Sequence, residues 1–185
     1  ADMVKTICLT LFGLPHSWIR HAIENMNGLE KYGWRWLVFT PNNIQTQKNV
    51  EVVPMDISQF NDLVYKKTGA TPNNRIEGGR PIKYVSDYYP VNGLIFEDYL
   101  KGSDFWGHAN WDVVYGRLDR WITYEFLSDC DIFGNDPNAI NGVFSLYRNI
   151  PFVNNLFKEI PNWQTALSDC SQNYITDEWL MTEVC

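Results

Sequence analysis

The chain has 185 residues, of which 45% are hydrophobic and 15% aromatic. This composition is typical of a packed globular protein and excludes a largely disordered one. Fifteen basic against twenty-two acidic residues give a net charge of −7, and general nucleic-acid binding needs a basic face instead. Because no internal repeat or long linker divides the sequence, we expect a single domain over residues 1–185, cut from a longer parent chain.

In chain order, the first half alternates between strand and helix patterns. A short apolar, β-rich run predicts a buried strand at 4–12, followed by a helix at 15–28 that Pro15 opens. Similar runs predict strands at 34–40 and 50–53. A helix at 56–69 follows, since its first residues have the form of a capping box and glycine ends it.

The second half continues the alternation after a turn-rich segment at 71–80, which predicts a loop. The further elements predicted by apolar spacing are a helix at 91–100, a strand at 105–115, a helix at 118–126, a strand at 143–147, and helices at 151–157 and 177–184. This order indicates an α/β domain with a mostly parallel central sheet flanked by α-helices.

The cysteines show no metal-ligand spacing. Cys8 lies in an apolar run, and Cys130, Cys170 and Cys185 form no C-x-x-C pair with it or with one another. A reduced, cytoplasmic protein is the simpler interpretation, while disulfide pairing stays open. Since no apolar run approaches transmembrane length, we expect no membrane segment.

The aromatic run at 105–115 carries a single carboxylate, Asp112, two residues after Asn110. In an extended strand these two side chains lie on the same side, with Trp111 opposite. Magnesium sites that bind nucleotides often use one or two carboxylates together with phosphates and water. The pair therefore predicts a divalent-cation site; the alternative is an ordinary buried strand whose aspartate falls at its exposed end.

Ligands of open α/β sheets bind beyond the carboxyl ends of the strands, where Phe12, Asn110 and Asp112 are expected. Lys83 and Asp87 enter the next helix and supply a cation for phosphate and a carboxylate for ribose or base. Alternatively, these two residues are a solvated pair in a loop.

Two later segments also carry candidate groups. Asn141 and Gly142 precede a strand, and glycine permits close approach of a ligand to the backbone; the alternative is a simple turn. Asp177 and Glu178 are suited to act as base or nucleophile, or to contact sugar hydroxyls. They are equally the acids that a helix favours in its first turn.

Taken together, these segments resemble glycosyltransferases of the GT-A fold. The block at 93–116 is similar to a group of small bacterial and viral polysaccharide-type transferases, including chlorella-virus domains that build capsid glycans, and residues 81–87 match their pattern as well. Those enzymes usually read Asp-x-Asp where this chain has Asn110 and Asp112. Residues 141–143 resemble the Asn-x-Gly region of retaining galactosyl- and glucosyltransferases, and 177–178 follow at a spacing similar to their later acidic motif.

The resemblance implies a hexosyltransferase that moves a sugar from a UDP-sugar donor to a glycan acceptor, and it favours retention of configuration. Its location would be cytoplasmic, in the host cytoplasm if the protein is viral. The residues that the resemblance implies for the nucleotide are Thr10, Leu11, Phe12, Lys83, Asp87 and Asn110. Those implied for the donor sugar are Asn141, Gly142 and Asp177. Asp177 and Glu178 are implied as the catalytic carboxylates.

The resemblance also implies a metal cofactor, Mn²⁺ or Mg²⁺, bound by Asp112 with help from Asn110. Because the amide of Asn110 contributes no charge, metal affinity should be lower than with two aspartates. This motivates an alternative, a degenerate module that binds a nucleotide-sugar or glycan without turnover. A glycoside hydrolase with paired carboxylates ranks last, since it leaves the Asn-x-Asp pair unexplained.

Overall fold

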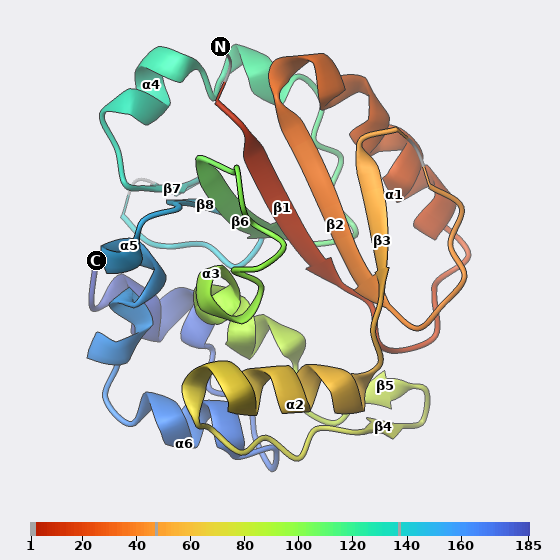
Figure 1. The fold of residues 1–185 in the computed structure, drawn as a ribbon, viewed down its shortest axis with the longest axis vertical. Coiled ribbons are helices and arrows are strands. Elements are labelled where there is room, and N and C mark those ends of the chain that lie inside the picture. The colour runs from red at the N-terminus through yellow and green to blue at the C-terminus, as the bar shows by residue number, and fades with distance from the viewer. Residues whose placement is uncertain (1–2, 47, 137) are drawn as a thin grey trace.

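A six-stranded, mostly parallel sheet forms the centre of the protein in the computed structural model, which describes residues 3–46, 48–136 and 138–185 (Figure 1). The strand order is β3-β2-β1-β6-β8-β7. Strands β1, β2, β3 and β6 are parallel neighbours, whereas β8 runs antiparallel to both β6 and β7. The predicted class, α/β with a mostly parallel sheet flanked by helices, is confirmed.

The strands are β1 (Lys5–Thr10), β2 (Trp34–Thr40), β3 (Val50–Pro54), β4 (Ile76–Glu77), β5 (Arg80–Pro81), β6 (Phe105–Ala109), β7 (Ile132–Gly134) and β8 (Phe144–Arg148). The α-helices are α1 (Ile19–Met26), α2 (Ile57–Thr68), α3 (Asn92–Ile95), α4 (Tyr124–Ser128), α5 (Pro151–Asn154) and α6 (Trp163–Ser168). Short 3-10 helices lie at Asn27–Tyr32, Val85–Val91, Leu118–Arg120 and Leu156–Glu159, and a π-helix lies at Thr176–Leu180.

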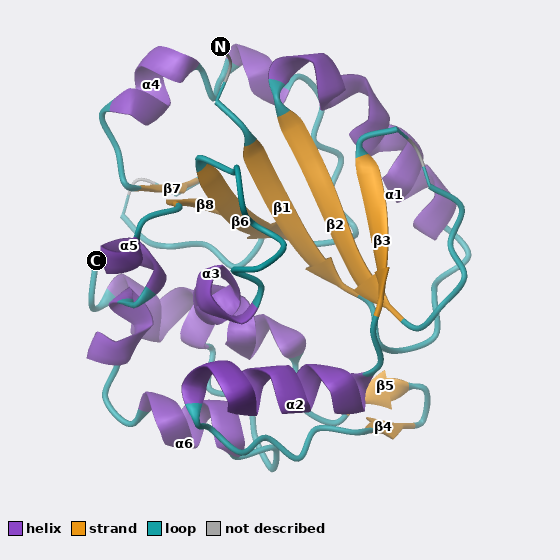
Figure 2. Ribbon diagram, in the orientation of Figure 1, coloured by secondary structure: helices purple, strands orange, loops and turns teal. Residues whose placement is uncertain are grey.

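Two hydrophobic clusters, one on each face, bury the sheet, and helices surround it (Figure 2). Alternate residues of a strand belong to different clusters: Ile7 and Leu9 pack with α1, while Cys8 packs with α2 and α3. Period-two alternation with both faces apolar is typical of parallel strands covered by helices. The continuous apolar runs seen in the sequence follow from this double burial.

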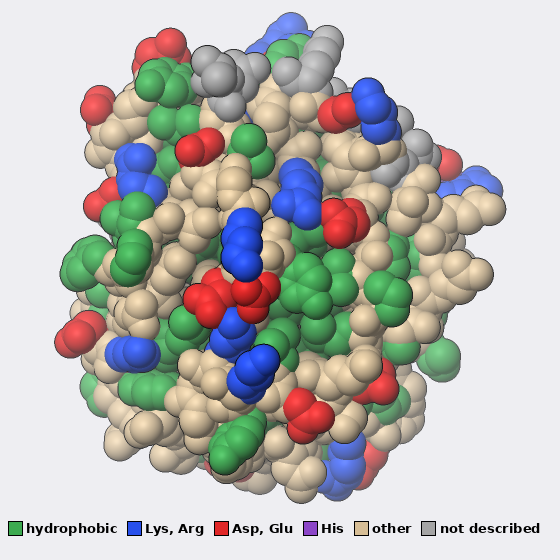
Figure 3. Space-filling model, viewed as in Figure 1, with side chains coloured by type: hydrophobic (Ala, Val, Ile, Leu, Met, Phe, Trp, Pro, Cys, Tyr) green, Lys and Arg blue, Asp and Glu red, His purple; other side chains and the backbone are tan. Residues whose placement is uncertain are grey.

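The helix predicted at 56–69 is confirmed in detail. The Asp56 side chain accepts from the Gln59 backbone N–H at 2.8 Å, and the Gln59 side chain accepts from the Asp56 N–H at 2.9 Å. Gly69 ends α2 in the left-handed conformation that glycine tolerates best. Lys67, in its last turn, pairs with Glu97 and Asp98, where acidic and basic side chains lie next to one another over α3 (Figure 3).

Several predicted elements are wrong in extent. The strand predicted at 105–115 ends at Ala109, because the chain turns there and the Trp111 indole donates to the Thr10 carbonyl at 3.1 Å. The helix predicted from Pro15 begins only at Ile19. The single amphipathic helix predicted at 118–126 is a 3-10 turn followed by α4, and it leaves Trp121 exposed.

Other elements are shorter than predicted or were not predicted. The helix at 91–100 is reduced to α3 after a 3-10 helix, and the loop at 71–80 holds β4 of a small hairpin. Neither β7 nor α6 is expected from the sequence. Both are short, and three to six residues carry too little periodicity to stand out.

All four cysteines are free in the structure. None of the helices within the described residues combines the length and the apolarity needed to cross a membrane.

A close contact between Gly93 and Trp106 gives a stability prediction. A Cβ on Gly93 would lie 2.4 Å from the fully buried Trp106 ring, whose indole donates to Asn154 Oδ1 at 2.6 Å. Overpacking of this kind costs about 1–3 kcal/mol, so Gly93→Ala should lower the free energy of unfolding by about that amount in denaturant titrations. In a Trp106→Phe background, which removes the ring atoms in question, the same change should cost clearly less. Equal costs in both backgrounds would contradict the contact.

Candidate functional site

The antiparallel pairing of β6 with β8 brings two distant candidate segments to one edge of the sheet. Ala109, the last residue of β6, pairs with Phe144, the first residue of β8. The residues just outside these strands therefore meet, and the Asn110 N–H donates to the Val143 carbonyl at 2.9 Å. Asn110 and the Asn141–Gly142 turn thus lie together beyond the carboxyl end of β6.

A third segment reaches the same edge from the carboxyl-terminal part of the chain. Ile175 has a left-handed backbone with φ of 54°, and the π-helix Thr176–Leu180 starts directly after it. A β-branched residue at positive φ is strained, and π-helical turns are frequent at functional sites. This backbone places Asp177 and Glu178 over Gly142.

Gly142 touches both carboxylates. Its N–H donates to Glu178 Oε1 at 3.2 Å, and a Cβ at this position would lie 2.3 Å from Asp177 Oδ2. The absence of a side chain is therefore what lets the two acids approach the turn before β8. The sequence predicted that a ligand would approach this backbone, whereas the groups that lie against it are carboxylates of the protein itself.

These groups surround an acidic cavity of about 240 Å³. Its lining includes Asn110, Gly142, Tyr84, Ile175, Asp177 and Glu178. Ser86 and Asp87 complete the lining. Asp87 included, five predicted residues from four separate stretches of sequence lie around this cavity.

Asp177 has an unusual electrostatic environment. Its side chain is buried, and this desolvation, with smaller contributions from the charges of Glu178 and Asp87, raises the pKa of the carboxyl to about 7. A carboxyl with this pKa exchanges a proton readily near neutral pH, as a general base or acid must.

A larger cavity of about 660 Å³ lies next to the first, between the loop after β1 and the β4–β5 hairpin. Thr10, Leu11 and Phe12 line it on one side and Gly79 and Arg80 on the other. The hairpin is held against the loop, since the Leu14 N–H donates to the Gly79 carbonyl at 3.0 Å. The two cavities share Tyr84 and Ser86 and are therefore neighbours.

The three residues predicted near the nucleotide base differ in what they offer this larger cavity. The Phe12 side chain is buried and packs on Phe60 with ring centroids 5.0 Å apart, so its backbone is the part available to a ligand. The Leu11 carbonyl accepts from Thr40 Oγ1 at 2.6 Å, and the Thr10 carbonyl accepts from Trp111.

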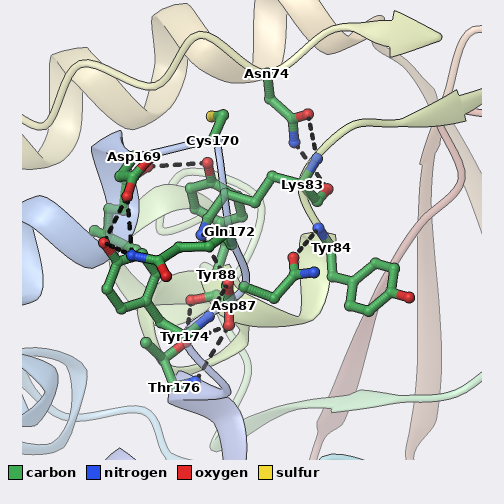
Figure 4. Close-up of polar contacts among 12 residues, drawn as sticks. Asn74, Lys83, Tyr84, Asp87, Tyr88, Asp169, Cys170, Gln172, Tyr174 and Thr176 are labelled. Carbon is green, nitrogen blue, oxygen red and sulfur yellow. Dashed lines mark hydrogen bonds and ion pairs between the residues drawn. The ribbon is translucent and has the colours of Figure 1, made fainter.

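Lys83 and Asp87 form a buried ion pair instead of a solvated one (Figure 4). Lys83 Nζ lies 2.7 Å from Asp87 Oδ2, and the two side chains are 0% and 1% exposed. The ammonium has a second acceptor in the Gln172 carbonyl at 3.2 Å and faces the Tyr174 ring at 4.8 Å. Lys83 lines the larger cavity and Asp87 the acidic one, but in this conformation the charge of the ammonium is used within the protein.

The oxygen atoms of Asn141 also accept hydrogen bonds from within the protein. Its side-chain oxygen accepts from the Val143 N–H at 2.7 Å, and its carbonyl accepts from Ser145 Oγ at 2.8 Å. The same carbonyl lies 3.3 Å from Nε2 of His108, whose pKa burial lowers to about 3. The imidazole is therefore neutral, with its proton assigned to Nε2. For a contact with a donor sugar, Asn141 offers its side-chain nitrogen.

The predicted metal ligands lie at the edge of this arrangement. Asn110 is half-buried and lines the acidic cavity, whereas Asp112 is exposed just beyond it. Burial, followed by the charges of Asp177 and Asp112, raises the pKa of Tyr89, so both carboxylates lie near this tyrosine.

Within the described part of the chain, no three His, Cys, Asp or Glu side chains gather to hold a metal by themselves. The strand expected to align Asn110 and Asp112 ends at Ala109, so both residues lie in the turn that follows it, where they could supply two oxygen ligands. Such a pair fits a hard cation that takes its remaining ligands from phosphates and water.

Some cavity-lining residues were missed in the sequence. Tyr84 and Ser86 line both cavities and belong to the block at 81–87 that carries the resemblance. Neither residue stands in a spacing that marks it as part of a binding site. Ile175 lines the acidic cavity because of its left-handed backbone, which nothing in an isoleucine signals.

Comparisons with known proteins identify one family. Searches of curated proteins and of solved structures found no match to this chain. Residues 12–184 match a protein family described as a family of unknown function, DUF6625. That match extends from the loop after β1 to the segment after the π-helix, so it covers every candidate residue except Thr10 and Leu11. The chain belongs to this family, DUF6625.

Proposed function

We propose that the protein is a metal-dependent glycosyltransferase that transfers a sugar from a UDP-sugar to a glycan acceptor. The observation that carries the proposal is the meeting of Asn110, Gly142, Asp177 and Glu178 around one cavity at the carboxyl end of β6. The sequence resemblance named these positions for one reaction although they lie up to 68 residues apart (178 − 110). The mostly parallel sheet is compatible with the GT-A fold.

The sizes of the two neighbouring cavities support the same assignment. The larger one, at the end of β1, has about 660 Å³ for the nucleotide, and Arg80 lines it as an exposed cation. The smaller, acidic one is suited to sugar hydroxyls, which carboxylates accept from. A donor would lie across the junction at Tyr84 and Ser86, with its diphosphate toward Asn110 and Asp112.

In the proposed reaction, Asp177 acts as general base. Its carboxylate takes the proton of the acceptor hydroxyl, whose oxygen forms a bond to the anomeric carbon while the bond from that carbon to UDP breaks. Asp112 and Asn110 would hold a divalent cation, which would supply Lewis-acid stabilisation of the departing diphosphate. The pKa of about 7 favours this role for Asp177. A reaction with a single base implies inversion of the anomeric configuration, whereas the sequence resemblance favours its retention. The anomeric configuration of the product, read by NMR, distinguishes the two.

Calorimetric titration of UDP with and without Mn²⁺ tests the proposal. We expect Mn²⁺ to tighten UDP binding at least about tenfold, or about 1.4 kcal/mol, in the wild type. Asp112→Ala should abolish this gain because it removes the only charge of the predicted metal pair. Asp62→Ala is the matched control, since Asp62 is an exposed acid on α2.

UDP binding that is absent, or indifferent to both metal and Asp112, would overturn the nucleotide-sugar assignment. Metal-dependent hydrolysis of the donor separates a transferase from the alternative, a non-catalytic binding module. A module would bind UDP and release no free sugar.

A further inference from the structure

The segment between α6 and the π-helix has no regular secondary structure, yet it delivers Asp177 and Glu178 to the cavity. Residues 169–175 form neither helix nor strand, so their backbone groups need other partners. Figure 4 shows these partners converging from the 3-10 helix at Val85–Val91 and the residues just before it.

Asp87 accepts hydrogen bonds from two backbone groups of this segment. Its Oδ2 accepts from the Tyr174 N–H at 2.9 Å, and its Oδ1 accepts from the Thr176 N–H at 3.2 Å. The Thr176 hydroxyl donates to the Asp87 carbonyl as well. Thr176 is the first residue of the π-helix, whose N-cap position is held by Ile175.

Lys83 fixes both the carboxylate and the other end of the segment. Its ammonium donates to Asp87 Oδ2 and to the Gln172 carbonyl. Its own backbone is clamped by Asn74, which accepts from the Lys83 N–H and donates to the Lys83 carbonyl, both at 3.1 Å. The ion pair is therefore rigid, buried and in contact with residues 172, 174 and 176.

We propose that Lys83 and Asp87 are positioning residues, whose buried ion pair clamps residues 172–176 and thereby holds Asp177 and Glu178 over Gly142. Their catalytic relevance rests on the proposed function, whereas the clamp itself is a property of the free protein. This assignment replaces the direct contact with nucleotide that the resemblance implied for both residues. A buried charge pair fits such a role, because breaking it from one side is costly and its geometry is well defined.

Carboxyl titration by NMR on protein labelled at aspartate tests the clamp without any ligand. The groups facing Asp177 are Glu178 on its own helix, Asp87 with its partner Lys83, Tyr89 of the 3-10 helix Val85–Val91, and Tyr147 of β8. We expect the resonance that Asp177→Asn removes to titrate near pH 7 in the wild type. In Asp87→Asn it should titrate at lower pH, because one of the charges that raise this pKa is gone.

Amide hydrogen exchange supplies the second measurement. Lys83→Met should speed exchange at the Tyr174 and Thr176 N–H groups, since their acceptor loses the cation that fixes it. The matched control is Lys67→Met, which breaks the ion pairs with Glu97 and Asp98 outside the cavity and should change neither readout. If Asp87→Asn alone does not fold, Lys83→Met/Asp87→Asn removes both charges and leaves no unpaired buried ion.

Activity separates positioning from nucleotide binding. For Asp87→Asn we expect UDP affinity within about twofold of wild type and turnover lower by at least about tenfold, the pattern of a lost transition-state contribution. A tenfold loss of UDP affinity would instead make the pair a nucleotide ligand and overturn the proposal. Unchanged titration and exchange would overturn it as well, even in a protein that binds no UDP, so the failure of the proposed function is recognised separately.

Discussion

Asp177→Asn is expected to lower the rate of sugar transfer strongly and, at the same time, to stabilise the fold, with the full gain reached at pH 7 and above. The loss of a general base typically costs about 10²–10⁴ in rate, because asparagine cannot accept the acceptor's proton. UDP binding should be unaffected, since Asp177 lines the acidic cavity and not the larger one. Turnover and calorimetry on the same preparation check both statements.

The stability gain follows from the direction of the pKa shift. The folded-state pKa of about 7 lies above the ordinary value of 3.8, so the folded protein holds this proton more tightly than the unfolded chain. Stability contributed by the neutral carboxyl is fully present below about pH 4 and is lost as pH rises to 7. At 1.36 kcal/mol per pKa unit, the wild type loses on the order of 4 kcal/mol over this window.

Thermal unfolding between pH 4 and 8 measures this difference. The two proteins should have similar stability near pH 4, the variant should gain steadily up to pH 7, and the gap should then stay constant. Asp62→Asn is the control, because Asp62 is an exposed acid on α2 and is not among the charges that raise the pKa of Asp177. A pH-independent gap, or an active Asp177→Asn protein, would remove Asp177 from the role of base.

The central sheet could be predicted because its strands are buried on both faces. The run Trp34–Thr40 is apolar except for Arg35 and Thr40, and β2 has the predicted bounds. The Asp56–Gln59 capping box likewise depends on neighbours in sequence, and it formed as expected. Both signals are local, so they need no knowledge of the tertiary fold.

The arrangement of the site could be predicted only in part. Asn110 and Gly142 lie together because β8 pairs antiparallel with β6. The sequence of one segment does not show which strands pair or in which direction. The burial of Lys83 with Asp87 depends on residues 172–176, about 90 positions away, so an exposed loop pair and a buried clamp have the same local sequence. The strained Ile175 is likewise imposed by tertiary contacts.

Gly142→Ala should impair catalysis with little effect on folding or on UDP binding. The added Cβ would lie 2.3 Å from Asp177 Oδ2 and 2.9 Å from Glu178 Oε1, which are the ends of flexible side chains. Because Gly142 is not at positive φ, alanine can adopt its backbone, and the carboxylates rotate away instead. Misplacement of a reacting group by about 1 Å costs on the order of 10²-fold in rate, and turnover should fall by about this factor.

The titration of Asp177 shows whether this loss arises from the carboxylates. A carboxyl pushed away from Gly142 becomes more hydrated, so its pKa should fall toward the ordinary range, and the rate should reach its plateau at a lower pH than in the wild type. Gly134→Ala, another glycine without positive φ, places its Cβ against Ala139 and not against an acid, so its pH profile should match the wild type. If Gly142→Ala lowers the rate without moving the pH profile, the glycine is required for the backbone turn before β8 and not for the position of the carboxylates. If it lowers the rate and shifts the profile together, the missing side chain at position 142 is what allows a buried carboxyl to work near neutral pH.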